Sequence, residues 1–139
     1  MKERIFLDTN VLVYLFDTDD PTKQRRVRDL LSSPELRAQV ILSTQVLQEF
    51  YVSVTRKPAT PLDLDTAFQA VQDLTAFPIV QIDPSLILLA IQRSSKAKVS
   101  FWDALIVEAA LVAGATLLYS EDFQDGAVFG ALRVTNPFR

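Results

Sequence analysis

The sequence predicts an α/β fold built as one domain around a parallel β-sheet. Short apolar runs of strand length alternate with longer segments of helical periodicity, and this alternation is typical of consecutive strand–helix units. The 139 residues suit a single domain, residues 1–139, with one hydrophobic core. Hydrophobic residues make up 49% of the chain, which is ordinary for a globular protein and too much for a disordered one.

Five short apolar segments are predicted to be the strands. In chain order they are residues 5–7, 40–42, 79–82, 116–119 and 132–134. The fifth is shorter than the fourth, and we expect it at an edge of the sheet.

The first three predicted helices lie in the first half of the chain. Residues 11–16 continue the first strand as an apolar helix, and residues 22–32 form a helix with a polar, basic side. Ser43 is suited to cap the third helix, which we expect to end at Lys57 and Pro58. The buried side of that third helix is expected to carry Val46, Leu47, Phe50, Tyr51 and Val54.

Three further helices are predicted in the second half of the chain. Thr60 and Pro61 start a helix that runs to about residue 76, with proline at its first position. Residues 83–94 form the next helix, opened by an Asp-Pro pair. The last covers residues 101–113 and ends at Gly114, which suits the position just past a helix C-terminus.

The residue types that the chain lacks exclude several kinds of enzyme. It has no histidine and no cysteine, so a Ser-His-Asp triad, a thiolate nucleophile and a zinc site of His or Cys are impossible. It has only three glycines and no glycine-rich phosphate loop. Carboxylates must therefore carry any catalysis, and they favour hard cations such as Mg²⁺ or Mn²⁺.

Composition also bears on location and partners. The apolar run at residues 5–7 is too short for a signal peptide, and no apolar stretch is long enough to span a membrane. With the lack of cysteine, this favours a cytoplasmic protein that does not enter membranes. The net charge of −3 argues against strong nonspecific binding of RNA, but metal ions in an acidic pocket would reverse the local charge.

Four acidic residues stand at ends or flanks of predicted elements. Asp8 ends the first strand and Asp122 follows the fourth, so they face each other if those strands are neighbours where the strand order reverses. Asp103 lies in the first turn of its helix, whose positive end favours a carboxylate. Glu49 lies beside the apolar stripe of its helix, where it could line the same crevice.

Each of these acids also has a purely structural interpretation. Asp8 could only cap the first helix, and Asp103 could only complete a capping box with Ser100. Glu49 could be a solvated surface residue, and Asp122 a turn residue. Convergence of all four would instead suit two divalent ions that activate water and stabilise charge during phosphodiester hydrolysis. Without metal, such a cluster should have raised pKa values.

Four blocks of the chain resemble the motifs of the PIN-domain family in the family's order. They are residues 6–14 (FLDTNVLVY), 48–50 (QEF), 102–106 (WDALI) and 118–123 (LYSEDF). Within the family the chain is most similar to VapC-type toxins of bacterial and archaeal toxin–antitoxin systems. The resemblance implies a parallel sheet in strand order 3-2-1-4-5 with helices on both sides. It also implies an endoribonuclease dependent on one or two Mg²⁺ or Mn²⁺ ions, a cognate antitoxin as partner, and a homodimer.

The same resemblance assigns roles to individual residues. The metal-binding and catalytic acids would be Asp8, Glu49, Asp103 and Asp122, with Asp8 as the central ligand. Ser120 would steady a water molecule or a carboxylate, and Thr9 and Asn10 would shape the turn and hydrogen-bond to Asp8. Asp125 is a possible extra ligand.

Other polar or aromatic residues near these motifs are expected to be structural. Glu108 should point away from Asp103, and Glu121 should be at the surface or behind the site. Trp102 is expected in the core or a dimer contact rather than as a platform for a stacked base. The basic run Lys23–Arg28 is a solvated helix face or, alternatively, a contact for RNA phosphates or an acidic antitoxin segment.

Two alternative functions remain open on sequence grounds. A phosphatase of the haloacid dehalogenase type also has an aspartate after its first strand, but it requires a second aspartate where this chain has Asn10. A PIN-like fold kept only for protein binding would be expected to have lost at least one acid, and all four are present.

Overall fold

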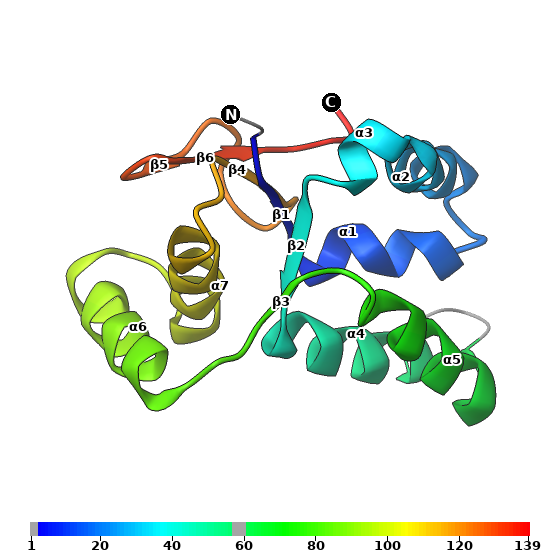
Figure 1. The fold of residues 1–139 in the computed structure, drawn as a ribbon, viewed down its shortest axis with the longest axis horizontal. Helices are drawn as coiled ribbons and strands as arrows, with labels where there is room; N and C mark the ends of the chain where they lie inside the picture. The colour runs from blue at the N-terminus through cyan, green and yellow to red at the C-terminus, as the bar shows by residue number, and fades with distance from the viewer. Residues whose placement is uncertain (1–2, 57–60) are drawn as a thin grey trace.

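A six-stranded sheet forms the centre of the molecule (Figure 1). The computed structural model describes residues 3–56 and 61–139. The strands are β1 (Ile5–Leu7), β2 (Val40–Ser43), β3 (Ile79–Val80), β4 (Leu117–Tyr119), β5 (Val128–Phe129) and β6 (Leu132–Thr135). Their spatial order is β3-β2-β1-β4-β6-β5, with every neighbouring pair parallel except β5 and β6.

The five predicted strands occur in the predicted order, and the sheet contains one further strand, β5, that was not predicted. The segment predicted as the fifth strand is β6, which pairs with β4 in parallel. It is not at the edge as expected, because β5 pairs with its outer side through a tight turn at Gly130. β5 is only two residues long and Val128 is exposed, so no alternation in the sequence marked it.

Helices cover both faces of the sheet. They are α1 (Thr9–Val13), α2 (Pro21–Ser32), α3 (Pro34–Arg37), α4 (Thr44–Arg56), α5 (Leu64–Leu74), α6 (Pro84–Lys96) and α7 (Phe101–Val112), with a 3₁₀ turn η1 (Tyr14–Phe16) after α1. In Figure 1, α6 and α7 lie on one side of β1 and β2, and α1 and α2 lie on the other. Among the helices at residues 3–56 and 61–139, none combines the length and hydropathy of a membrane span.

Helix starts follow the local capping signals closely, with one exception. Asp83 and Ser100 cap α6 and α7, and Gly114 has the positive φ expected of a glycine that ends a helix. The helix expected to start at Pro61 begins instead at Leu64, because the Asp63 carboxylate caps it by accepting from the Thr66 backbone N–H.

Smaller differences concern element length and burial. Residues 11–16 divide into α1 and η1, β3 is half the predicted length, and the short helix α3 was not expected. Tyr51 is exposed rather than buried, since it lies beyond the edge of the buried face of α4. The predicted helix end at Lys57 and Pro58, and the predicted start at Thr60, lie outside the described residues.

The strand order reverses direction at β1. The chain places β2 on one side of β1 and β4 on the other, both parallel to it, so a crevice forms beyond the carboxyl ends of β1 and β4. The core below it is dry, since Phe6, Leu7, Leu42 and Leu118 are fully buried. This rigid base fixes the residues that directly follow the two strands.

Candidate functional site

Asp8 occupies the reversal point at the end of β1. Its backbone N–H donates to the Tyr119 carbonyl at 3.0 Å, so the ladder between β1 and β4 reaches up to it. Its carboxylate caps α1 by accepting from the Thr9 backbone N–H at 2.7 Å. It also accepts from the Ser120 hydroxyl at 2.7 Å and the Asn10 amide at 3.3 Å. Asp8 therefore both caps α1 and lies in the crevice, so its structural and its functional interpretation do not exclude each other.

The surroundings of Asp8 disfavour its charge. Its side chain is almost completely buried, and this burial raises the pKa of Asp8 to about 7. The hydrogen bonds from Ser120 and Thr9 lower this pKa, whereas the negative charges of Asp122 and Glu49 raise it further. Within the described residues, only neutral groups donate to Asp8.

The other three predicted acids lie around the same crevice. The Glu49 carboxylate, on α4, accepts from the Thr9 hydroxyl at 2.8 Å. Asp103 lies in the first turn of α7. Burial raises the pKa of Asp103, and the negative charges of Asp122 and Glu49 raise it further. Asp122 follows β4, and its backbone N–H donates to the Ser120 hydroxyl at 3.0 Å. Ser120 therefore links Asp8 to Asp122.

The charges of these acids affect one another's pKa values, but the carboxylates do not converge on one point. Across residues 3–56 and 61–139, no three acidic side chains form a group placed to hold a metal ion as they stand. Mutual repulsion keeps uncompensated carboxylates apart, and Glu49 is held by Thr9 and Gln45. The donor set is nevertheless all hard oxygen, which suits Mg²⁺ or Mn²⁺. A cation would also offset the burial and the added repulsion that raise the pKa values of Asp8 and Asp103.

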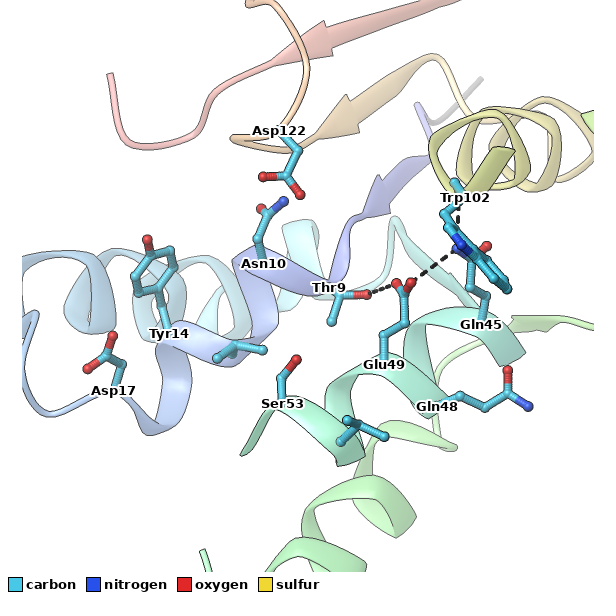
Figure 2. A pocket seen from close by; sticks show the side chains of 12 residues that line it. Thr9, Asn10, Tyr14, Asp17, Gln45, Gln48, Glu49, Ser53, Trp102 and Asp122 are labelled. Carbon is cyan, nitrogen blue, oxygen red and sulfur yellow. Dashed lines mark hydrogen bonds between the residues drawn. The ribbon is translucent and has the colours of Figure 1, made fainter. Parts of the chain in front are cut away.

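A cavity of about 760 Å³ opens beside Glu49 and Asp122, while Asp8 and Asp103 are not among the residues that line it (Figure 2). Its walls come from α1, α4, the start of α7 and the loop after β4. The lining residues are Thr9, Asn10, Val13, Tyr14, Asp17, Gln45, Gln48, Glu49, Val52, Ser53, Trp102 and Asp122. The cavity is large enough for a nucleotide-sized group, since ligand sites typically measure about 300–1,000 Å³.

Two lining residues differ from what the sequence indicated. Gln45 is buried, and its amide donates to Glu49 at 3.4 Å and to the Trp102 carbonyl at 3.1 Å. Its Oε1 atom is buried without a hydrogen-bond partner in the described residues. Trp102 is 61% exposed, so the expectation of a core position is wrong, whereas the alternative expectation of a dimer contact stays a prediction. Gln45 shares its helix face with Gln48, Glu49 and Ser53, so no pattern in the sequence marked it as buried.

Several acids and bases lie outside the cavity. Asp125 accepts from the Asn136 backbone N–H at 2.8 Å and lies 4.0 Å from the Arg139 guanidinium, and its role as an extra ligand stays a prediction. Glu108 points away from Asp103, as expected, and pairs with Arg93. Lys23 of the basic run pairs with Glu121, which lies behind the site and also accepts from the Tyr14 hydroxyl.

The comparisons with known proteins agree on the fold. Residues 5–124 match the family model described as PIN domain. No curated protein sequence matches the chain. Solved structures similar to it include the sarcin-ricin-loop-cleaving toxin VapC20 of Mycobacterium tuberculosis, with 22% identity, a TM-score of 0.68, and coverage of 93% of this chain and 98% of that one.

Two further structures give the same result. A toxin–antitoxin complex from Klebsiella pneumoniae is 20% identical with a TM-score of 0.69, covering 96% of this chain and 97% of that one. The VapBC2 complex of Rickettsia felis, bound to a DNA fragment from its promoter, is 14% identical with a TM-score of 0.63. That match covers 94% of this chain and 96% of the other.

Proposed function

Because the chain belongs to the PIN domain family, we propose that it is a metal-dependent endoribonuclease and the toxin of a toxin–antitoxin pair. The observation that carries the proposal is Asp8, a buried carboxylate with neutral donors and two acidic neighbours at the strand reversal. Burying a charge is costly unless a counter-charge compensates it. A divalent cation would supply that counter-charge.

The four acids would hold the metal in distinct ways. Asp8 would be the central ligand because it is the most buried of them, and Asp122 and Glu49 would approach it from β4 and α4. Asp103 would approach from the start of α7, where the helix end favours negative charge. One or two bound ions would lower the pKa of a water molecule and stabilise charge on the scissile phosphate.

Three polar residues would keep the acids in position. Ser120 donates to Asp8 and accepts from the Asp122 backbone N–H, so it fixes the distance between the two ends of the crevice. Thr9 donates to Glu49 while its own N–H binds Asp8. Asn10 donates to Asp8 and to Ser120, and its carbonyl oxygen accepts from the Glu121 backbone N–H.

The partners follow from the same family relationship. The similar structure from Klebsiella pneumoniae is a toxin–antitoxin complex, which supports an antitoxin as the partner of this chain. We also propose that it acts in the cytoplasm on RNA and forms a homodimer. Co-expression with the protein encoded directly upstream, followed by size-exclusion chromatography, tests both the antitoxin complex and the homodimer.

The deciding experiment is cleavage of a mixed RNA pool by the purified protein. We expect cleavage with Mn²⁺ or Mg²⁺, none with a chelator, and at least a hundredfold loss in Asp8→Asn, since loss of metal stabilisation costs several kcal/mol and each 1.36 kcal/mol is about tenfold in rate. Asp125→Asn is the matched control, because it makes the same chemical change at a carboxylate that is exposed rather than buried.

The same experiment separates the competing interpretations. Equal cleavage by the wild type and Asp8→Asn would rule out the metal site described here. A folded wild type that cleaves no RNA, binds no Mn²⁺ and still binds an antitoxin would favour a PIN domain kept only for protein binding. No observation on this chain favours the dehalogenase-type phosphatase.

A further inference from the structure

Trp102 is a large aromatic side chain left open at the rim of the cavity. Its residue is 61% exposed, although tryptophan is highly buried on average. It stands in the first turn of α7 directly before Asp103, and it lines the same cavity as Glu49 and Asp122 (Figure 2). An exposed indole beside three candidate metal ligands is placed where substrate must pass.

The neighbours of Trp102 hold it in place. Its ring packs edge-to-face against Phe101, with centroids 5.1 Å apart and an angle of 71° between the ring planes. Its backbone carbonyl accepts from the buried Gln45 amide, which also donates to Glu49. A ring held in this way loses little freedom when a ligand packs against it. Its position is also tied to that of a candidate metal ligand.

The cavity wall near Trp102 is polar but not basic. Gln45, Gln48 and Ser53 project from α4, with Gln48 exposed and Gln45 Oε1 unpartnered (Figure 2). Among the described residues that line the cavity, none is lysine or arginine. This part of the wall is therefore suited to the face and edges of a base rather than to phosphate, since amides and hydroxyls read base edges.

We propose that Trp102 is a stacking platform for one unpaired nucleobase of the RNA, next to the phosphate that the acids would hold. The proposal rests on the proposed nuclease function and narrows its substrate to single-stranded segments, because a base within a duplex has no free face to offer. A protein partner is the competing occupant of this surface. The carboxylates of Glu49 and Asp122 in the same cavity argue against it, because charged residues are depleted at the centre of protein interfaces.

Intrinsic fluorescence tests stacking directly, because Trp102 is the only tryptophan in the chain. The Asp8→Asn variant is titrated, in Mg²⁺, with a short single-stranded RNA of mixed sequence. The same strand is then tested annealed to its complement, and a third titration uses an abasic strand of equal length. We expect the single strand to quench the emission, and the duplex and the abasic strand to leave it nearly unchanged.

Substitutions then measure the contribution of the ring. Binding of fluorescein-labelled single-stranded RNA, followed by anisotropy, is expected to weaken about 5- to 150-fold in Trp102→Leu, the range reported for loss of one base–aromatic stack. Trp102→Phe should keep most of the affinity. Phe68→Leu, which removes another exposed aromatic ring outside the cavity, is the control and should bind like the parent protein. Circular dichroism melts show whether each variant is folded.

The outcomes distinguish this proposal from the one on which it rests. Cleavage that needs Asp8 but is equally fast in wild type and Trp102→Leu would overturn the stacking platform and leave the nuclease intact. Equal quenching by the abasic strand would also overturn it. Emission that changes with protein or antitoxin concentration but not with RNA would assign Trp102 to a protein interface instead. Quenching by single-stranded RNA without any cleavage would support the platform and count against the nuclease.

Discussion

Two buried carboxylates of this protein are treated in opposite ways by the fold. Asp8 is 4% exposed and Glu108 is 8% exposed. Glu108, on α7, accepts from Arg93 Nε of α6 at 2.6 Å, and the Arg93 guanidinium also lies over the Phe129 ring. Asp8 has neutral hydrogen-bond donors, and its charged neighbours are also acidic. The fold therefore compensates the charge of Glu108 with Arg93, and within the described part of the chain it leaves the charge of Asp8 without a cationic partner.

The presence or absence of a counter-charge distinguishes a structural carboxylate, Glu108, from the proposed ligand-binding carboxylate, Asp8. A protein gains nothing in stability from a buried carboxylate that lacks a counter-charge, so such a group indicates a ligand that supplies one. Glu108 needs no ligand because Arg93 is already there. Four predictions test this contrast, in order of the expected change in the free energy of unfolding.

The largest effect should appear in the pH dependence of stability without metal. Burial raises the pKa of Asp8 from 3.8 to about 7, so the folded protein holds a proton that the unfolded chain has lost between these values. The free energy of unfolding must therefore fall as the pH rises through this window, by up to about 4 kcal/mol. Asp103 adds to the fall in the same direction, since its pKa is also raised.

Urea denaturation in chelator at about pH 4 and about pH 8 measures this fall. Asp8→Asn should remove most of it, because an amide carries no charge at either pH. Asp125→Asn should keep it in full, since the Asp125 side chain is 38% exposed and its charge stays solvated on folding. A fall of the same size in Asp8→Asn would show that the charge of Asp8 is compensated after all.

The second effect is the cost of removing the counter-charge of Glu108. Arg93→Met leaves that carboxylate unpaired, and we expect a loss of about 2 kcal/mol, below the usual range for fully buried pairs because the two side chains are 27% and 11% exposed. Adding Glu108→Leu should restore most of the stability. Once folded, both variants should cleave RNA like the wild type. A large loss of cleavage in either would mean that the Arg93–Glu108 pair positions the active-site end of α7 and is more than structural.

The third effect is stabilisation by the metal itself. Mg²⁺ or Mn²⁺ at about ten times its dissociation constant should add roughly 1.4 kcal/mol to the free energy of unfolding, because it binds only the folded state. Thermal melts with and without metal should show this shift in wild type and in Arg93→Met, and not in Asp8→Asn. A shift that survives in Asp8→Asn would place the ion elsewhere.

The sequence predicted those parts of the site that short stretches of the chain determine, and it missed those that depend on contacts between distant residues. Asp8 and Ser100 cap helices, and a cap is recognisable within a few residues. The approach of Asp122 to Asp8 required the further assumption that β1 and β4 are neighbours, which the strand-reversal rule supplied. These parts of the site were therefore predictable.

The contributions of Gln45 and Trp102 depend on tertiary contacts that leave no local trace. Gln45 is held by the carbonyl of Trp102, a residue 57 positions away, so its sequence neighbours gave no sign of burial. Trp102 was expected in the core or in a dimer contact, yet the first turn of α7 places it on the cavity rim. The strand β5 was missed for a similar reason, since pairing with β6 alone defines it.

The smallest effect concerns an ion pair that resembles the Arg93 pair in geometry but not in burial. Lys23 binds the carboxylate of Glu121, yet the two side chains are 30% and 21% exposed. Water and salt screen such a pair, so Lys23→Met should cost less than about 1 kcal/mol, and that cost should disappear in high salt. The cost of Arg93→Met should persist in the same salt, because a more buried pair is screened less. Equal salt sensitivity of the two variants in urea denaturation would mean that burial does not set the difference between these carboxylates.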